Sequence, residues 1–365
     1  MRRALTPLLA LTFLFTALSP TSALEPLEGF LRSTTLAGPS ALIVDPSDGK
    51  VILEKSPDEL RTPASLLKLI STSTALHYLG TEKRYITSIW STDKDGSYVI
   101  KGGMDPWLTS SGLKAEKNNQ RYLPNLIASA NTPKRKYLTI YYSNMYKQDL
   151  TELVYQQRKA GIRIKAIPIS ISDADAKAKS EIQSMTSEPI TTMVSYAILW
   201  SVNELADRLG KQAVKKQGNP LTPQGITTTF KSALKDLGVQ SEGLYVEDGS
   251  GLSKATRAAP RIFVELLIKI RHDPELQAIY VGLPVAGETG TLKNRFSTAR
   301  EAVGKVHAKT GLLRTVASLA GYVDVGSREY VFAIIADQIP PGSTAQRAAR
   351  KTIDEMVGSI VKGNT

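Results

Sequence analysis

Ser65 and Lys68 stand three residues apart and could act as a nucleophile and its general base. A serine hydroxyl attacks an acyl carbon only when a nearby base takes its proton. On a helix, residues three apart share one face, so the amine of Lys68 could reach the oxygen of Ser65. Leucine and isoleucine flank Lys68 on both sides, and burial among such residues lowers the pKa of a lysine. The pair therefore predicts a neutral amine that can accept the serine proton near pH 7.

The surroundings of Ser65 distinguish it from other serines, because the Ser-x-x-Lys pattern is common in this chain. The pattern begins at Ser47, Ser65, Ser91, Ser111, Ser232 and Ser359. Only Ser65 follows Thr62-Pro63, a pair that we expect to cap a helix. There the free N–H groups of the first turn could stabilise an oxyanion. The structural alternative is that Ser65 supports the cap while Lys68 extends into solvent.

The triplet Lys309-Thr310-Gly311 lies near the end of an expected strand and occurs once in the chain. Lys309 and Thr310 could present a cation and a hydroxyl to the anionic end of a substrate. Gly311 would let the backbone approach a ligand closely, although it could also simply end the strand. The triplet therefore predicts a binding edge for a carboxylate.

A third motif, Ser201-Val-Asn203, lies in an expected helical region. The same pattern at 129–131 shows that the tripeptide alone carries little information. Its place in the sequence carries more, because it stands between the Ser65–Lys68 pair and the Lys309 triplet. This ordered set resembles the serine penicillin-recognising enzymes.

Longer segments narrow the resemblance to one family. They resemble the D-alanyl-D-alanine carboxypeptidase/endopeptidase family, the class C low-molecular-mass penicillin-binding proteins, and they follow one another in that family's order. The segments are Gly102-Gly-Met-Asp-Pro106, Asp248-Gly-Ser-Gly-Leu-Ser253, Leu283-Pro-Val-Ala-Gly287, Gly290-Thr-Leu292 and Ala320-Gly-Tyr-Val323. The resemblance spans nearly the whole chain after residue 23.

The resemblance implies a catalytic or positioning role for each of four residues. Ser65 would attack the D-Ala-D-Ala carbonyl of a peptidoglycan stem peptide, and Lys68 would take its proton. Ser201 would relay a proton to the leaving amine. Asn203 would hold Lys68 and the substrate amide. β-Lactam antibiotics would acylate the same serine, and water would release the natural acyl group.

The resemblance also implies how substrate is held. Lys309 would sustain a positive field, and Thr310 would bind the substrate carboxylate. The residue after Gly311 is Leu312, and its backbone N–H would form the oxyanion hole together with that of Ser65. The family usually has Thr or Ser where Leu312 stands, so the contribution of a second hydroxyl to carboxylate binding is missing here.

Two departures leave an alternative function open. Besides Leu312, the stretch between Lys68 and Ser201 is shorter than the family's usual insertion. A catalytically weak penicillin-binding or cell-wall scaffold protein of the same fold is therefore the alternative to an active carboxypeptidase. Endopeptidase action on peptide cross-links is a further expectation. A β-lactamase is disfavoured, because no extra carboxylate stands in a deacylating motif, and we expect a long-lived penicilloyl adduct.

The pattern of elements predicts an α+β fold. A hairpin at 40–54 and strands at 304–337 indicate one antiparallel sheet built from both chain ends and flanked by helices. The polar, turn-rich stretch 81–180 predicts a shortened α/β inserted lobe. Residues 24–80 and 181–365 then form one discontinuous domain, which the resemblance implies to be serine β-lactamase/DD-peptidase-like.

Composition and charge restrict the class of protein. The 365 residues carry a net charge of +12, and no cysteine is present, which excludes disulfides and thiol chemistry. With three widely spaced histidines we expect no metal site and no cofactor. The basic residues are dispersed rather than interleaved with aromatics, so we expect no nucleic-acid partner. The positive charge suits peripheral association with the cell wall or a membrane surface.

The first 23 residues predict a secretory signal peptide. Arg2 and Arg3 precede a mostly apolar run from Leu5 to Leu18, and small residues follow at 21–23. Cleavage after Ala23 would remove two arginines and no acid, leaving a charge of +10 on an exported protein. An uncleaved amphipathic anchor is the alternative.

Overall fold

Apolar residues near both ends of the chain form one antiparallel sheet. The computed structural model describes residues 25–363, so the predicted signal peptide lies outside the described residues. The sheet has the order β2-β1-β10-β9-β8. Its strands are β1 (Ser40–Asp45), β2 (Lys50–Lys55), β8 (Val306–Leu313), β9 (Val316–Val325) and β10 (Arg328–Ala336). Ile43 of the first strand pairs with Phe332 of the last, so the two ends of the chain share a core.

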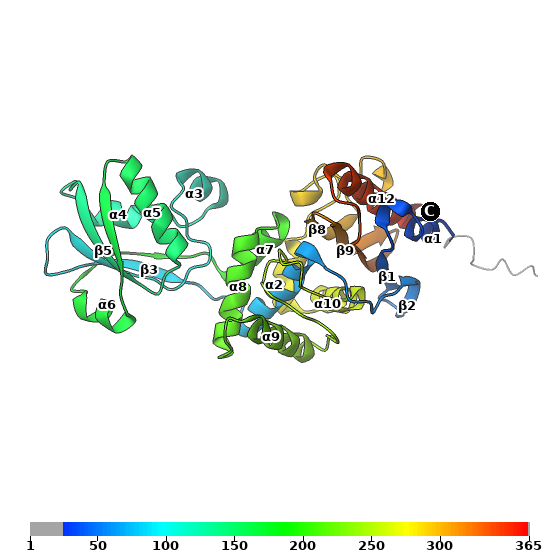
Figure 1. Cartoon of the computed structure of the whole chain (residues 1–365), viewed down its shortest axis with the longest axis horizontal. Helices are drawn as coiled ribbons and strands as arrows, with labels where there is room; N and C mark the ends of the chain where they lie inside the picture. The colour runs from blue at the N-terminus through cyan, green and yellow to red at the C-terminus, as the bar shows by residue number, and fades with distance from the viewer. Residues whose placement is uncertain (1–24, 364–365) are drawn as a thin grey trace, which may run out of the picture.

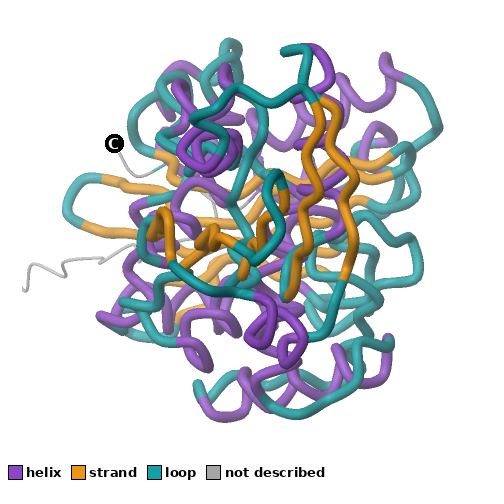
Figure 2. Tube along the Cα trace, turned by 90° about the vertical axis from the view of Figure 1, so that its left-hand side faces the viewer, coloured by secondary structure: helices purple, strands orange, loops and turns teal. Residues whose placement is uncertain are grey.

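Helices cover both faces of this sheet, and Figure 2 shows strands running between helical layers. The larger layer packs around α2, whose residues are buried on every side because other helices surround it. Its members are α2 (Leu67–Leu79), α7 (Ile190–Leu199), α8 (Asn203–Lys216), α9 (Pro223–Asp236), α10 (Pro260–His272) and α11 (Gln277–Val281). The other layer holds α1 (Glu25–Leu31) and α12 (Ser343–Lys362). The α+β prediction is therefore confirmed.

A second sheet forms the inserted lobe, drawn at the left of Figure 1. Its order is β6-β5-β4-β3-β7, with β4, β5 and β6 parallel to one another. The strands are β3 (Ile86–Ser91), β4 (Ser97–Lys101), β5 (Tyr137–Ser143), β6 (Arg163–Pro168) and β7 (Glu181–Thr186). The helices are α3 (Gly112–Asn118), α4 (Pro124–Ala130), α5 (Lys147–Lys159) and α6 (Ile171–Lys177).

The lobe extends beyond the boundary predicted at residue 180. Strand β7 pairs antiparallel with β3 from Ile86–Thr186 onwards, so 181–186 belongs to the lobe sheet rather than to the main domain. The sequence of β7 is mostly polar and exposed, because the strand lies at the edge of the sheet. Without an apolar alternation, nothing in the segment indicated a strand.

A buried ion pair joins the lobe to the main domain. Arg208 of α8 donates to both carboxylate oxygens of Asp149 on α5, at 2.8 and 3.2 Å. Its guanidinium lies 4.0 Å from the ring centroid of Tyr146. Both members of the pair are buried, and removal of Arg208 would leave Asp149 without its partner, whereas Arg208 also pairs with the exposed Glu204 at 2.7 Å. The lobe is thus attached to the helix that begins at Asn203.

Candidate active site

Ser65 lies in a short 3-10 turn that leads into α2. The turn is η3 (Ala64–Leu66), and α2 begins only at Leu67. Ala64 has a left-handed backbone (φ 52°), which places Ser65 on a sharp bend. The predicted Thr62-Pro63 helix cap is wrong, since no side chain caps either helix start.

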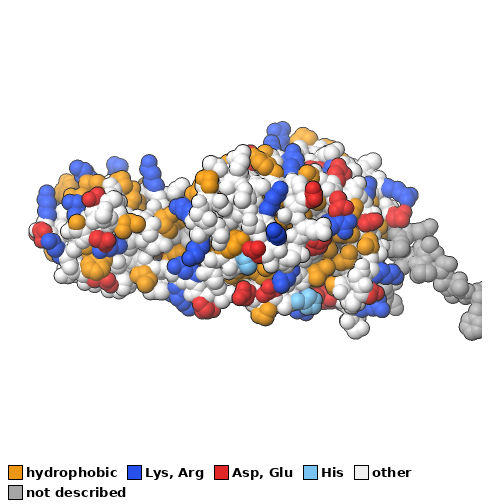
Figure 3. Space-filling view, turned by 90° about the horizontal axis from the view of Figure 1, so that it is seen from below, with side chains coloured by type: hydrophobic (Ala, Val, Ile, Leu, Met, Phe, Trp, Pro, Cys, Tyr) orange, Lys and Arg blue, Asp and Glu red, His pale blue; other side chains and the backbone are white. Residues whose placement is uncertain are grey.

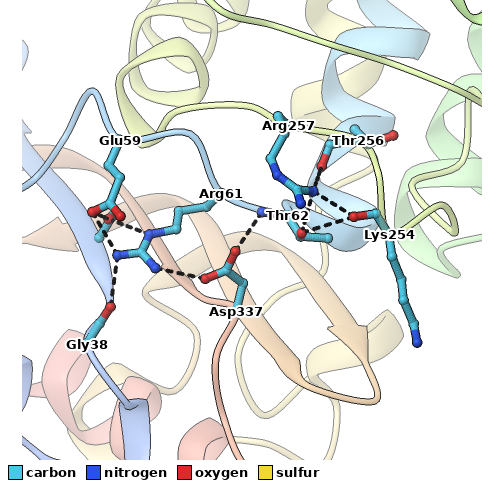
Figure 4. Close-up of polar contacts among 9 residues, drawn as sticks. Gly38, Glu59, Arg61, Thr62, Lys254, Thr256, Arg257 and Asp337 are labelled. Atoms are coloured by element: carbon cyan, nitrogen blue, oxygen red, sulfur yellow. Dashed lines mark hydrogen bonds and ion pairs between the residues drawn. The ribbon is translucent and has the colours of Figure 1, made fainter.

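Thr62 makes other contacts instead, which Figure 4 shows. Its backbone N–H donates to Asp337 at 3.0 Å, and its hydroxyl accepts from Arg257 at 3.0 Å. Asp337 also accepts from the buried guanidinium of Arg61 at 3.0 Å. Arg61 in turn donates to the hydroxyl of Ser40 at the start of β1. These contacts attach the segment before Ser65 to the ends of two sheet strands.

We expect Asp337→Ala to lower the free energy of unfolding by about 3 kcal/mol, because it removes the more buried carboxylate partner of Arg61 and the acceptor of the Thr62 N–H, and leaves only the half-exposed Glu59 to pair with this buried charge. Side-chain exposure is 8% for Arg61 and 14% for Asp337. Urea unfolding at pH 7 measures the change. Glu59→Ala is the matched control, since Glu59 binds the same guanidinium but is half exposed, and should cost less than about 1 kcal/mol. Equal losses for the two variants would contradict this assignment.

Lys68 is fully buried and points at the serine. Its Nζ lies 2.8 Å from Oγ of Ser65, 2.7 Å from Oδ1 of Asn203 and 2.6 Å from the carbonyl oxygen of Ser250. Burial lowers the pKa of Lys68 to about 7, against the opposing effect of Asp248 and other carboxylates. The alternative in which Lys68 extends into solvent is therefore wrong. A large fraction of this amine is neutral near pH 7 and can accept a proton.

The carbonyl of Ser250 is a functional group that the sequence analysis missed. It lies in a tight turn in which Asp248 accepts hydrogen bonds from three backbone N–H groups, those of Ser250, Gly251 and Ser253. Burial alone would raise the pKa of Asp248. These bonds and the Ser250 hydroxyl lower that pKa by more, so the net shift is downward and the carboxylate stays ionised. Gly251 is required here, because a Cβ would lie 2.0 Å from the Ala64 carbonyl oxygen.

Ser201 lies at a break between two helices, not inside the continuous helical region that was expected. Its backbone is left-handed (φ 55°), between the end of α7 and the start of α8. This break turns the Ser201 hydroxyl toward Lys309, whose Nζ donates to it at 2.8 Å. Asn203, the first residue of α8, reaches Lys68 instead. The motif therefore connects the two buried lysines.

Lys309 is also fully buried, and burial lowers its pKa well below the usual value, assisted by the charge of Lys68. Its Nζ contacts the hydroxyl of Ser201 and the carbonyl oxygen of Thr310. No carboxylate contacts it among the described residues. An anionic ligand at this position would raise the pKa and favour the charged amine.

Strand β8 presents a free edge beside the nucleophile turn. The N–H of Ala308 donates outward to Pro284, and because strand geometry repeats every two residues, the N–H groups of Thr310 and Leu312 also point away from β9. A Cβ on Gly311 would lie 2.8 Å from the Pro63 carbonyl oxygen, so the strand touches the turn that carries Ser65.

The other two predicted binding residues lie at the same edge. The hydroxyl of Thr310 contacts that of Thr291 at 2.9 Å, a partner that the sequence analysis did not name. The side chain of Leu312 is 40% exposed, and it offers no hydroxyl to a ligand. The eight predicted site residues therefore come from three elements that contact one another: the 3-10 turn with the start of α2, the helix break, and the strand edge.

A family model decides the identity of this arrangement. The D-Ala-D-Ala carboxypeptidase 3 (S13) family matches residues 30–121 and 127–359. The chain belongs to this family. The match includes both lysines, the helix break and the strand edge. The resemblance drawn from the motifs is thus confirmed.

Individual relatives agree with the S13 assignment. A D-alanyl-D-alanine carboxypeptidase of Actinomadura sp. is 32% identical over 48% of this chain and 33% of its own length. The chain therefore matches about a third of that relative. The structure of penicillin binding protein 4 from Haemophilus influenzae has the same fold, with a TM-score of 0.72, 16% identity, and coverage of 92% of this chain and 98% of that one.

A third relative is a penicillin G-acylated endopeptidase. Bd3459 of Bdellovibrio bacteriovorus has a TM-score of 0.63 and 18% identity, and the match covers 89% of this chain and 92% of the Bd3459 chain.

Within residues 25–363, no group of three or more His, Asp or Glu could hold a metal ion. No helix in that range is long and apolar enough to cross a membrane.

Proposed function

We propose that this S13 protein is a serine-type D-alanyl-D-alanine carboxypeptidase that acts on peptidoglycan stem peptides. The observation that carries the proposal is the 2.8 Å contact between Ser65 and Lys68, whose amine is buried and has a pKa of about 7. Asn203 and the Ser250 carbonyl fix the orientation of that amine. The same geometry favours an enzyme over the scaffold alternative, because Lys68 is in hydrogen-bond reach of Ser65 and Lys309 is in reach of Ser201.

The reaction begins when Lys68 takes the hydroxyl proton of Ser65. The serine oxygen then bonds to the carbonyl carbon of the penultimate D-alanine, and the peptide C–N bond breaks. Ser201, hydrogen-bonded to Lys309, gives its hydroxyl proton to the departing amine of the terminal D-alanine, and the proton that Lys68 took from Ser65 replaces it, so the acyl-enzyme forms with both groups in their starting protonation states. Water hydrolyses the acyl-enzyme and restores the free serine. A β-lactam follows the first step but keeps its leaving group tethered.

Two backbone N–H groups are proposed to hold the developing oxyanion. They belong to Ser65, on the 3-10 turn, and to Leu312, on the free edge of β8. Such donors are worth roughly 10²–10³ each in rate in serine hydrolases. The substrate carboxylate would bind Thr310 and raise the lowered pKa of Lys309, so that the amine becomes charged. Lys309 would therefore supply the predicted positive field only while an anion is bound. Leu312 provides no second hydroxyl for that carboxylate.

The test combines labelling and product release. A fluorescent penicillin should mark the protein and leave Ser65→Ala unmarked, and the adduct should persist for many minutes. Free D-alanine should appear from a soluble pentapeptide only with the unmodified serine. Labelling without D-alanine release would favour the scaffold alternative. Rapid turnover of a chromogenic cephalosporin would instead favour a β-lactamase.

Acylation should depend on pH through the amine of Lys68. Its pKa is lowered to about 7, so the amine is protonated and inactive below that pH and neutral above it. The rate should rise about tenfold per pH unit below pH 6 and level off above pH 8. Stopped-flow measurement of penicillin acylation from pH 5 to pH 9 checks this. A rate that is still rising steeply at pH 9 would indicate an ordinary lysine.

We propose that the protein is exported and acts outside the cytoplasm. The basic start, the apolar run and the small residues at 21–23 support this proposal. Intact-protein mass spectrometry of the native protein should give the mass expected for a chain that begins at Leu24. A chain retaining Met1 in the cell envelope would indicate the uncleaved anchor.

A further inference from the structure

One face of the lobe sheet is only partly covered, and it is exposed at Tyr137, Arg163 and Lys165. Alternate strand residues point to opposite faces, and one set, which includes Ile89, Ile100 and Leu138, packs in the core beneath α4 and α5. The short helix α6 covers part of the opposite face, where Ala174 is buried. We call this second surface the aromatic face, and define it by Trp90, Lys101, Tyr137, Tyr141, Arg163 and Lys165.

Each ring on the aromatic face has a cation beside it. The distances from cation to ring centroid are 4.4 Å for Lys101 and Trp90, 4.9 Å for Lys177 and Tyr141, and 5.7 Å for Arg163 and Tyr137. Tyr137 is 67% exposed, although most rings of this size are largely buried. It lies four residues from Tyr141 on one strand, about 13 Å away. The rings therefore form an extended row rather than a single pocket.

A hollow of about 560 Å³ opens where β5 and β6 begin, with Tyr137 in its wall. Four cations line it, Lys94, Arg135, Arg163 and Lys165. The single acid in the lining, Asp95, is bound to Arg135. The other three cations have no ion-pair partner among the described residues. Figure 3 views the lobe from the α6 side and shows basic and apolar side chains close together there.

The charge of the lobe agrees with an anionic ligand. Residues 81–188 contain seventeen Lys and Arg against eleven Asp and Glu, a net charge of +6. On the aromatic face Asp175 pairs with Lys101 at 2.7 Å, so that end is closer to neutral. The excess of positive charge lies at the other end, around Arg163 and Lys165. A suitable ligand combines flat apolar ring faces with spaced carboxylates.

We propose that the aromatic face binds an acidic glycan strand of the cell wall, and so positions the main domain on polymeric substrate. This inference rests on the proposed function, because stem peptides are attached to such strands, and a sugar whose stem peptide has been removed exposes the free carboxylate to which the peptide was joined. Pyranose rings present C–H groups that stack on tyrosine and tryptophan, and their carboxylates match the unpaired cations. A nucleic acid would need a cation for nearly every phosphate, and the acids interspersed on this face oppose that.

The binding test uses Ser65→Ala protein, which cannot process the ligand. Co-sedimentation with insoluble glycan strands stripped of stem peptides measures the bound fraction in low salt. We expect the change R163E/K165E to weaken binding about tenfold, and Y137A to weaken it severalfold. The matched control is K114E/K117E, which makes the same charge change on exposed residues of α3 and should bind normally. An equal loss of glycan binding in this control would show that net charge alone explains the effect, and would overturn the assignment.

Activity assays separate this proposal from the proposed function. With an intact serine, R163E/K165E should release D-alanine from a soluble pentapeptide at the normal rate, but from insoluble wall several times more slowly. If no variant, including the unmodified protein, releases D-alanine, the carboxypeptidase proposal fails, while the binding result still stands. Normal glycan binding by R163E/K165E would overturn the glycan proposal alone. Tighter binding of single-stranded DNA than of glycan would do the same.

Discussion

Replacing Lys68 by methionine should slow acylation by a fluorescent penicillin by about 10⁴-fold. The amine lies 2.8 Å from the Ser65 oxygen, and its contacts with Asn203 and Ser250 hold it there. Methionine has a similar length and no charge, so the buried site loses its base while its volume stays filled. The second-order acylation rate constant, measured by gel fluorescence over time, gives the effect.

The control for this substitution is Lys235→Met. Lys235 is exposed near the end of α9, and its removal should leave the acylation rate unchanged. Circular dichroism and thermal unfolding should show that Lys68→Met remains folded. Acylation of folded Lys68→Met at the normal rate would show that another group activates Ser65.

Gly311→Ala should reduce acylation by about 10²-fold in a folded protein. The new Cβ would lie 2.1 Å from the Ser318 hydroxyl oxygen and 2.8 Å from the Pro63 carbonyl oxygen, so the strand edge must move away from the nucleophile turn. A displacement of about 1 Å in a catalytic arrangement typically costs that much in rate. The effect should appear in the rate constant for acylation and in D-alanine release alike.

Two further variants test whether the cause is this contact. Gly29→Ala introduces the same methyl group on α1, where nothing lies within 4 Å, and should be neutral. Ser318→Ala in the Gly311→Ala background removes the shorter of the two clashes and should restore part of the rate. A double variant no faster than Gly311→Ala alone would show that Ser318 is not responsible.

The contact between Ser65 and Lys68 follows from local geometry, which is why the sequence could predict it. A spacing of three brings side chains together in a 3-10 turn as well as in an α-helix. The error in the predicted helix start therefore does not affect the predicted contact between Ser65 and Lys68. The burial of Lys68 was also foreseeable, since apolar residues flank it. The sheet assembled from both chain ends was predictable from the nearly continuous apolar runs of β1, β9 and β10, the turns between them, and the partial alternation of β8.

Long-range contacts set the limits of prediction. Threonine is a common helix-capping residue, but the N–H of Thr62 donates to Asp337 and its hydroxyl accepts from Arg257, both distant in sequence. The Ser250 group that contacts Lys68 is a backbone carbonyl, which no side-chain motif identifies. The Asp-Gly-Ser-Gly sequence indicates only a tight turn at that place. Ser201 was placed inside a helix because apolar residues continue on both sides of it, and a left-handed residue leaves no trace in that pattern.

The signal peptide and the effect of Leu312 stay predictions. The signal peptide lies outside residues 25–363, and export awaits a measurement on the native protein. The effect of Leu312 on carboxylate binding also stays open to test, since its exposed side chain lies beside the proposed oxyanion N–H. Leu312→Thr should therefore lower KM for the pentapeptide more than it changes kcat.

The central claim is that Lys68 is a neutral base near pH 7, and its titration tests this most directly. Nitrogen-15 NMR of protein labelled at lysine Nζ should show a resonance that titrates with a midpoint of about 7 and disappears in Lys68→Met. Lys309→Arg distinguishes it from the second buried amine. If the resonance assigned to Lys68 stays protonated up to pH 9, the amine cannot deprotonate Ser65 and the proposed chemistry is wrong.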